Sequence, residues 1–254
     1  MANTGYVTEN RFYKNKTDIK EYWFGVGAFF CVLIGFIDFF IGFTCLIAVC
    51  IAFLIYRIKY YVPETFRVGA RGEEYTLSLL KLLPDKFAIF NQVLIPNDRA
   101  EKGYNEIDFV IVGENAVFVV EVKNIKGVVC GHINERYWIK KHISSSGKEY
   151  EKKIYNPIYQ VRHQANVLRY YFKKTTGIKL PVVEMVFFSH PEVKLNIDGI
   201  NNSPVPIFIR SFENYFVKFI IHTDKRIYSS CFVKRKIIEE LKTLKEDEKF
   251  LLQE

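Results

Sequence analysis

The sequence predicts an α/β or α+β domain, with a mixed sheet flanked by helices, behind an N-terminal membrane-anchoring helical hairpin. Two observations predict this class. Residues 22–56 form a run of 35 positions in which Asp38 is the only charged residue, and the rest of the chain alternates apolar and amphipathic segments. Those segments follow the order helix, three strands, helix, strand, which is typical of a sheet covered by helices. With 254 residues and 16% aromatic side chains, the chain can bury a sizeable core.

The apolar run at residues 22–56 is too long for one straight membrane span. As a helix it would extend over about 52 Å, whereas the hydrocarbon layer is about 30 Å thick. It is also too long for a signal-peptide core, and no A-x-A-like cleavage site follows it. Two short spans of roughly 17 residues each, turning near residues 35–38, agree with the length best. The alternative is one tilted span with an interfacial helix before it.

Basic residues flank the apolar run on both sides: Arg11, Lys14, Lys16 and Lys20 precede it, and Arg57, Lys59, Arg67 and Arg71 follow it. Because Lys and Arg favour the cytoplasmic side, we expect residues 1–21 and the soluble domain to face the cytoplasm at the cell membrane. Asp38 would then lie at the far-side turn. The five cysteines have neither a disulfide framework nor zinc-ligand spacing, which agrees with a reducing compartment.

The soluble part divides into a core at residues 62–190 and a C-terminal extension at 191–254 that we expect to pack on it. Hydrophobic periodicity and turn residues predict the elements. Helices are expected at 69–83, 156–174, 212–221 and 229–244, and strands at 87–95, 106–112, 116–123, 128–132, 137–141, 181–189 and 207–210. The strands at 128–132 and 137–141 are expected to extend the same sheet as the earlier ones. Loops are expected at 96–104, 144–147 and 196–206, and a short hairpin turn at 113–115.

The strand hairpin around residues 113–115 carries the candidate chemistry. Glu121 and Lys123 are two apart in an otherwise apolar strand, so they project from one face. The turn brings the preceding strand alongside, and Asp108 can then reach the same end of the sheet. Two carboxylates with open positions suit Mg²⁺ or Mn²⁺, and a lysine beside them can polarise a phosphate. The E-x-K pattern alone is also typical of a solvated strand face.

Further motifs occur in a fixed order: Gly69-Ala70-Arg71-Gly72-Glu73, Ile107-Asp108, Glu121-Val122-Lys123-Asn124, Trp138 and Asn156-Pro157-Ile158-Tyr159-Gln160. In this order they resemble the nuclease-related domain (NERD) family of the PD-(D/E)xK nuclease superfamily, over about residues 65 to 190. The resemblance implies a restriction-endonuclease-like fold. It implies Asp108 and Glu121 as metal ligands, Lys123 as the catalytic lysine, and Glu73 and Gln160 as residues that complete the site.

Three of these residues have simpler interpretations. Glu73 can simply stabilise its predicted helix, because a negative charge near the helix N-terminus interacts favourably with the helix dipole. Gln160 and Gln164 are four apart on one helix face, and only Gln160 matches the motif. Trp138 is more typical of a core residue than of a platform for base stacking.

Positive charge gathers around the candidate site. Between Glu121 and Leu180 there are 13 Lys and Arg residues against 4 Asp and Glu residues, a net charge of +9 in a chain of net charge +8. Such a patch favours a nucleic acid, although an anionic lipid surface would attract it too. The expected nucleic-acid contacts are Lys140, Lys141, Lys152, Lys153, Arg162 and Arg169.

Together these patterns predict a membrane-anchored, Mg²⁺- or Mn²⁺-dependent nuclease that hydrolyses phosphodiester bonds. DNA is preferred over RNA as its substrate, and endonuclease over exonuclease action. The alternative is a catalytically silent nucleic-acid-binding or interaction module that is tethered to the membrane. The retained Asp108, Glu121 and Lys123 favour the enzyme, because a silent module has no need of all three.

Overall fold

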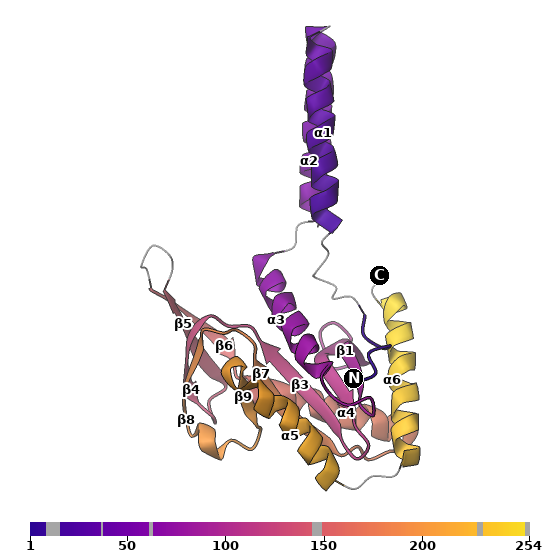
Figure 1. The fold of residues 1–254 in the computed structure, drawn as a ribbon, viewed down its shortest axis with the longest axis vertical. Helices are drawn as coiled ribbons and strands as arrows, with labels where there is room; N and C mark the ends of the chain where they lie inside the picture. Colours follow the sequence, from indigo (N-terminus) through magenta and orange to yellow (C-terminus); the bar gives the residue numbers. More distant parts are fainter. Residues whose placement is uncertain (9–15, 37, 61–62, 144–148, 228–230, 252–254) are drawn as a thin grey trace. The chain divides into compact units, whose positions relative to one another are not determined.

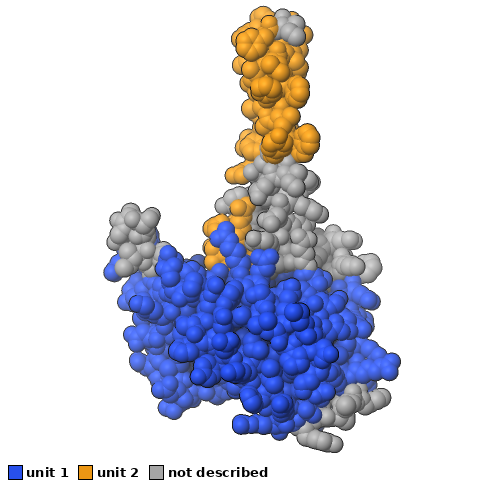
Figure 2. Space-filling view, in the orientation of Figure 1, with its two compact units in different colours: residues 1–8, 71–254 blue, residues 9–70 orange. Residues whose placement is uncertain are grey.

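A computed structural model of the chain describes residues 1–8, 16–36, 38–60, 63–143, 149–227 and 231–251. The chain forms two compact units, residues 1–8 with 71–254 and residues 9–70 (Figure 2). The N-terminal residues therefore belong to the same unit as the soluble domain, although residues 9–70 separate them in the sequence. The loop predicted at 144–147 lies outside the described residues.

Residues 9–70 contain a helical hairpin. Helices α1 (Lys16–Gly35) and α2 (Phe39–Tyr60) run side by side in opposite directions (Figure 1). The turn lies at the predicted place, and the charged residue there, Asp38, has a structural role. Its Oδ1 accepts hydrogen bonds from the backbone N–H groups of Phe40 (3.0 Å) and Ile41 (3.1 Å), so it caps the start of α2.

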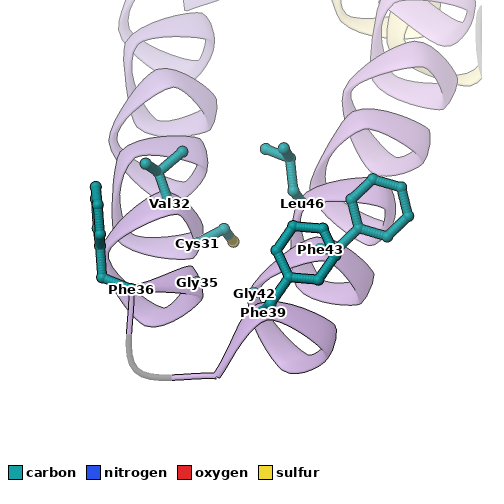
Figure 3. Close-up of a pocket in the computed structure, with 8 residues that line it drawn as sticks. All are labelled: Cys31, Val32, Gly35, Phe36, Phe39, Gly42, Phe43 and Leu46. Atoms are coloured by element: carbon teal, nitrogen blue, oxygen red, sulfur yellow. The ribbon is translucent and has the colours of Figure 1, made fainter.

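Small residues allow the two helices of the hairpin to approach closely. A Cβ atom added at Gly42 would lie against the backbone of Gly35, and one at Gly27 would be 3.9 Å from Val49. Side chains from both helices, among them Cys31 and Leu46, line an apolar pocket of about 230 Å³ near the turn (Figure 3). Close backbone approach through glycine is the usual packing mode of helices in a membrane.

Only part of the hairpin has the length of a membrane span. Within the described residues, one helix is long and apolar enough to cross a membrane, over Phe39–Arg57. The apolar part of α1, Tyr22–Gly35, is shorter. At 1.5 Å per residue these stretches measure about 28 Å and about 21 Å, against roughly 30 Å of hydrocarbon. The hairpin is thus present, and its crossing of a membrane by two spans stays a prediction.

The other unit contains two mixed sheets. The first has the strand order β1-β2-β3-β7-β9, with β1 to β3 antiparallel and β3, β7 and β9 parallel. Its strands are Ala88–Pro96, Tyr104–Val112, Val117–Lys123, Val182–Phe188 and Ile207–Ile209. The second has the order β6-β5-β4-β8, with strands Glu149–Tyr155, Tyr137–Ile143, Gly127–His132 and Val193–Asp198. The helices are α3 (Glu64–Leu80), α4 (Pro157–Thr176), α5 (Glu213–Arg226) and α6 (Cys231–Leu251), with short 3₁₀ turns at Ile200–Asn202 and Arg210–Phe212.

The prediction that β4 and β5 extend the first sheet is wrong. The parallel strands β3 and β7 are each followed, after a turn, by β4 and β8. These two strands also pair in parallel, but they belong to the second sheet. Gly127, at φ +101°, is at the start of β4. Two strands were also missed. β6 is short and exposed on most of its positions, and β8 occupies part of the loop predicted at 196–206.

Both faces of the first sheet are buried. Alternate residues such as Phe90, Val110 and Val119 belong to one core, together with residues of α4 and α6. Their neighbours, such as Ile89 and Phe109, belong to another, together with residues of α3 and α5. Helices on both faces explain why these strands are almost continuously apolar, and they confirm the predicted mixed sheet flanked by helices.

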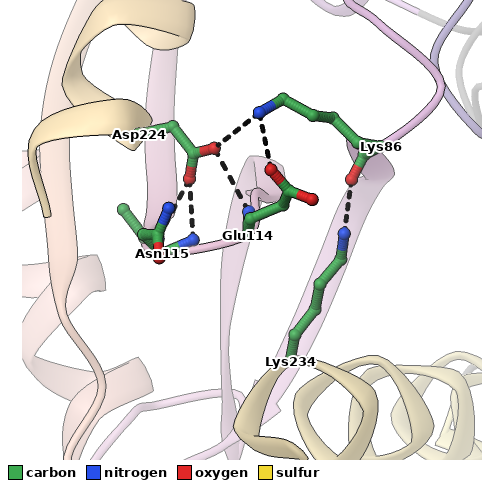
Figure 4. A network of polar contacts seen from close by, with 6 residues as sticks. Lys86, Glu114, Asn115, Asp224 and Lys234 are labelled. Carbon is green, nitrogen blue, oxygen red and sulfur yellow. Dashed lines mark hydrogen bonds and ion pairs between the residues drawn. The ribbon is translucent and has the colours of Figure 1, made fainter. Parts of the chain in front are cut away.

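The turn between β2 and β3 is held from α5. Asp224 is fully buried, and its carboxylate accepts the backbone N–H groups of Glu114 (3.3 Å), Asn115 (2.9 Å) and Ala116 (3.2 Å) (Figure 4). Lys86 Nζ lies 2.7 Å from a Glu114 carboxylate oxygen and 3.6 Å from Asp224 Oδ2. The turn and its Asp224 clamp thus fix the end of the hairpin that is farther from the candidate chemistry.

Residues 1–8 pack along β1. The backbone of Asn3 exchanges hydrogen bonds with Phe87 and Ile89, forming a parallel bridge to Ala88. Tyr6 stacks on Phe90 with 4.7 Å between ring centroids. The Asn91 side chain accepts the Thr8 N–H (2.9 Å) and donates to the Thr8 carbonyl (2.8 Å). The N-terminal segment is therefore an integral part of the domain.

Candidate active site

The candidate site lies where β2 and β3 separate. Their ladder ends at the pair Phe109–Val120. At the next residue of β2, Asp108 Oδ2 accepts the backbone N–H of Val122 at 2.8 Å. A side chain therefore satisfies a backbone donor of β3 that the ladder no longer pairs. The Asp108 carboxylate is therefore held between the two strands, at the end of the hairpin opposite the Asp224 clamp.

Strand β1 is also disturbed beside Asp108. Asn91 pairs with Phe109, and Val93 pairs with Ile107, which places Gln92 opposite Asp108. Gln92 has a φ of +46°, within the left-handed region that non-glycine residues rarely adopt. The regular pairing is therefore interrupted on both sides of Asp108.

Glu121 and Lys123 project from one face of β3, as the strand period predicts. Lys123 Nζ lies 2.6 Å from Glu121 Oε1. It also donates to Gln160 Oε1 at 2.9 Å, so the motif residue of α4 contacts the motif lysine. The Glu121 side chain is 2% exposed and that of Lys123 is 23% exposed, which leaves the lysine open toward solvent.

Helix α4 is aligned by its first residues. Asn156 Oδ1 accepts the Ile158 N–H at 2.9 Å and caps the helix, while Pro157 occupies its first turn. The Asn156 amide also donates to the carbonyls of Ile133 and Glu135, which ties the helix start to the second sheet. The Asn-Pro motif thus aims the following turns of α4 at β3.

Gln164 does not match the family motif, yet it contacts the site directly. Its Nε2 donates to Glu121 Oε2 at 2.8 Å and to the Glu106 carbonyl at 3.1 Å. Gln92 was missed as well, and its Nε2 donates to Glu73 Oε2 at 3.1 Å. Two features of the sequence could have indicated these residues. Gln164 is a second glutamine one helical turn after Gln160, and Gln92 belongs to a polar pair inside the apolar strand β1.

Close packing explains Gly72 of the first motif, whereas a Cβ atom at Gly69 would have no neighbour within 4 Å in the described structure. A Cβ atom at Gly72 would lie 2.6 Å from Asn124 Cβ and 2.6 Å from Ser189 Oγ. These two residues follow the parallel strands β3 and β7, and the Ser189 N–H donates to the Lys123 carbonyl at 3.0 Å. Glycine at position 72 therefore lets α3 approach the strand ends and bring Glu73 with it.

Charges in the site act strongly on one another. Burial, followed by the negative charges of Glu121 and Glu73, raises the pKa of Asp108 well above its ordinary value. Burial alone would lower the pKa of Lys123, but the charge and hydrogen bond of Glu121 and the charge of Asp108 leave that pKa raised. An excess of carboxylates around a single lysine is an environment that attracts a cation.

The donor set can be compared with what a divalent cation needs. In the part of the chain that is described, no group of three or more His, Cys, Asp and Glu side chains is placed to hold a metal. Mg²⁺ does not need one, because it binds through one or two carboxylates and completes its shell with water and substrate phosphate. Gln164 Oε1 is buried and has no hydrogen-bond partner among the described residues, so it is an acceptor that a bound water could satisfy. Asp108 and Glu121 therefore fit such an ion.

The expected nucleic-acid contacts lie on three elements, β5, β6 and α4. Lys140 and Lys152 face each other across β5 and β6, and burial together with the Lys152 charge lowers the pKa of Lys140. Lys141 is paired with Glu151 at 2.8 Å. Arg169 is paired with Glu184 at 2.7 Å and bonds the carbonyl of Val182, at the end of β7 remote from Lys123.

The remaining expected contacts, Lys153 and Arg162, are exposed. Trp138 is fully buried and its Nε1 donates to the His132 carbonyl at 2.9 Å, so it is a core residue as its simpler interpretation predicts. The positive charge that is free to meet a phosphate thus lies on the β5–β6 edge and on α4.

Comparison with known proteins gives one match. Residues 68–189 match a family model described as the nuclease-related domain. The matched range includes all five predicted site residues, and it begins within α3 and ends just after β7. No curated protein and no solved structure matches the chain.

Proposed function

Through residues 68–189 the chain belongs to the nuclease-related domain family, and we propose that it is a membrane-anchored, metal-dependent nuclease that hydrolyses phosphodiester bonds. The observation that carries the proposal is the meeting of Asp108, Glu121 and Lys123 where β2 and β3 separate. Restriction-endonuclease-like topology, Mg²⁺ or Mn²⁺ as the cofactor, DNA as the preferred substrate and endonuclease action are parts of the same proposal.

Each residue has a defined part in the proposed reaction. Asp108 and Glu121 would hold the ion, which when bound polarises the phosphate and lowers the pKa of a coordinated water. Lys123 directs its ammonium group at the phosphate and stabilises the negative charge that develops there. Gln160 accepts one Lys123 N–H and restricts the orientation of the lysine. Glu73, held by Gln92, adds negative charge next to Asp108.

The basic β5–β6 edge supports a nucleic-acid substrate. Like charges directly opposite each other in a ladder are destabilising, so the Lys140–Lys152 pair is retained at a cost to stability. A polyanion would relieve that repulsion. Binding through such lysines releases counterions and weakens steeply as salt rises.

Membrane anchoring is supported by the surface and connectivity of the hairpin. Large apolar side chains such as Phe36, Phe39 and Phe40 are 84%, 68% and 79% exposed, which water disfavours and lipid accepts. Because residues 1–8 and 71–254 form one unit, both ends of the hairpin must emerge on the same side of a membrane. The basic flanks favour the cytoplasmic side of the cell membrane.

The test uses the full-length protein in nonionic detergent, because residues 1–8 are part of the folded domain. Wild type and Lys123→Ala are incubated with labelled single- and double-stranded DNA and RNA, and with closed circular DNA, in Mg²⁺, Mn²⁺ or EDTA. Lys126→Ala is the matched control, because Lys126 lies three residues away and pairs at the surface with Glu192.

We expect cleavage that needs the metal, falls about 100-fold or more in Lys123→Ala and is retained in Lys126→Ala. Nicking of closed circles would show endonuclease action, since a circle has no end. Tight, salt-sensitive binding without cleavage in any metal would instead support the silent, membrane-tethered binding module.

A further inference from the structure

Gln164 occupies the gap that opens between β2 and β3. The ladder between these strands has ended at Phe109–Val120, and Gln164 reaches in from α4. Its Nε2 bonds the Glu106 carbonyl on β2 and Glu121 Oε2 on β3. A single amide therefore bridges the two strands beyond the pair Phe109–Val120, where their backbones no longer pair.

The orientation of this amide is determined by its partners. Both the Glu106 carbonyl and the Glu121 carboxylate are acceptors, so the group that faces them must be the NH₂ end. The side chain is 4% exposed, and a buried amide that was turned around would place its oxygen against two acceptors. The donor is thus fixed on Glu121.

The two carboxylate oxygens of Glu121 have separate partners. Oε1 is 2.6 Å from Lys123 Nζ, and Oε2 is 2.8 Å from Gln164 Nε2. Without the amide, the carboxylate could rotate so that both oxygens meet the lysine. The lysine would then be occupied by Glu121, and the carboxylate would be turned away from a metal.

We propose that Gln164 is a positioning residue, which holds the Glu121 carboxylate in the orientation that binds the metal and leaves Lys123 available to the phosphate. This inference rests on the proposed function, but it concerns a residue outside the family motif. Partners that orient a metal ligand typically contribute 10- to 100-fold to metal affinity.

The test measures Mn²⁺ affinity by titration calorimetry on the full-length protein in nonionic detergent, with thermal unfolding of each variant recorded alongside. Gln164→Met removes the N–H donors but keeps the length and volume of the side chain. Leu168→Met is the matched control, since Leu168 is fully buried one turn further along α4. Gln164→Asn, which keeps an amide on a shorter side chain, serves as a second variant if Gln164→Met does not fold.

We expect Gln164→Met to bind Mn²⁺ about 10- to 100-fold more weakly than wild type, while Leu168→Met stays close to wild type and both unfold at similar temperatures. Gln164→Asn should fall between them. Equal Mn²⁺ affinity in wild type and Gln164→Met would overturn the inference, and so would an equal loss in both methionine variants.

The same titration separates this inference from the proposed function. A wild type that binds Mn²⁺ but cleaves nothing would contradict the nuclease alone, and the affinities would still decide the role of Gln164. A wild type that does not bind Mn²⁺ would overturn both.

Discussion

Gln92 lies opposite Asp108 in the register of β1 and β2, yet its backbone has a φ of +46°. A left-handed conformation costs a non-glycine residue about 1–2 kcal/mol. The domain accepts this cost at a buried position, where the Gln92 amide then reaches Glu73. Strained backbone of this kind gathers at functional sites, because the surrounding structure must enforce it.

Replacing Gln92 separates the strain from the amide contact. Gln92→Gly and Gln92→Ala both lose the hydrogen bond to Glu73, but only glycine relieves the left-handed backbone. We expect Gln92→Gly to be more stable than Gln92→Ala by about 1 kcal/mol in chemical denaturation. Both variants should lose metal-dependent cleavage to a similar extent, because both free Glu73 from this contact. An alanine variant as stable as the glycine variant would contradict the strain.

The Asp224 clamp is expected to govern stability without governing the site. Asp224→Ala leaves three consecutive backbone N–H groups of the β2–β3 turn without their acceptor, and we expect a loss of about 3 kcal/mol in unfolding free energy. Glu114→Ala removes only the partly exposed partner of Lys86 and should cost less than about 1 kcal/mol.

Cleavage by Asp224→Ala, measured well below its unfolding temperature, should equal that of wild type. The clamp holds the Val112–Val117 end of the hairpin, whereas Asp108 and Glu121 lie at the other end. A comparable loss of stability in Glu114→Ala would contradict the role given to the buried carboxylate.

The sequence was informative where local pattern and burial agree. Strands β1, β2, β3 and β7 are apolar on both faces and are bounded by polar turns, so their positions were predicted to within about two residues. The start of α4 was also predicted, because Asn156 and Pro157 are cap and first-turn residues. The i, i+2 spacing likewise predicted that Glu121 and Lys123 share a face.

What could not be predicted depends on contacts between distant segments. β6 is an exposed, highly charged strand, and its pairing with β5 gives no hydrophobic alternation to detect. In the sequence, Gln164 cannot be distinguished from an ordinary polar residue of a helix, because its contacts depend on the separation of β2 and β3. The docking of residues 1–8 depends on Asn91, which lies 83 positions away from Thr8.

The docking of residues 1–8 predicts the side of the membrane on which the N-terminus lies. In a background without native cysteines, Asn3→Cys and Lys194→Cys should react together with a membrane-impermeant maleimide, in vesicles of one orientation. Both positions are exposed and belong to the same unit. Labelling of the two sites in vesicles of opposite orientation would show a single crossing and would contradict the hairpin anchor.

The close approach of α1 and α2 predicts that Gly42 cannot be enlarged. A Cβ atom there would overlap the Gly35 backbone and come within 2.9 Å of the Cys31 carbonyl, and neither can move without separating the helices. Gly25→Val is the matched control, because a Cβ atom at Gly25 has no neighbour within 4 Å in the described structure.

The separation of the helices can be followed by cross-linking in lipid vesicles, again without native cysteines. Cysteines at Gly27 and Val49 should form a disulfide readily, since a Cβ at Gly27 lies 3.9 Å from the Val49 side chain. We expect Gly42→Val to reduce this cross-link several-fold and Gly25→Val to leave it unchanged. If Gly42→Val cross-links as well as the control, the hairpin is not held by this glycine contact, and the packing of α1 on α2 must come from the aromatic pairs near Phe24 and Phe53.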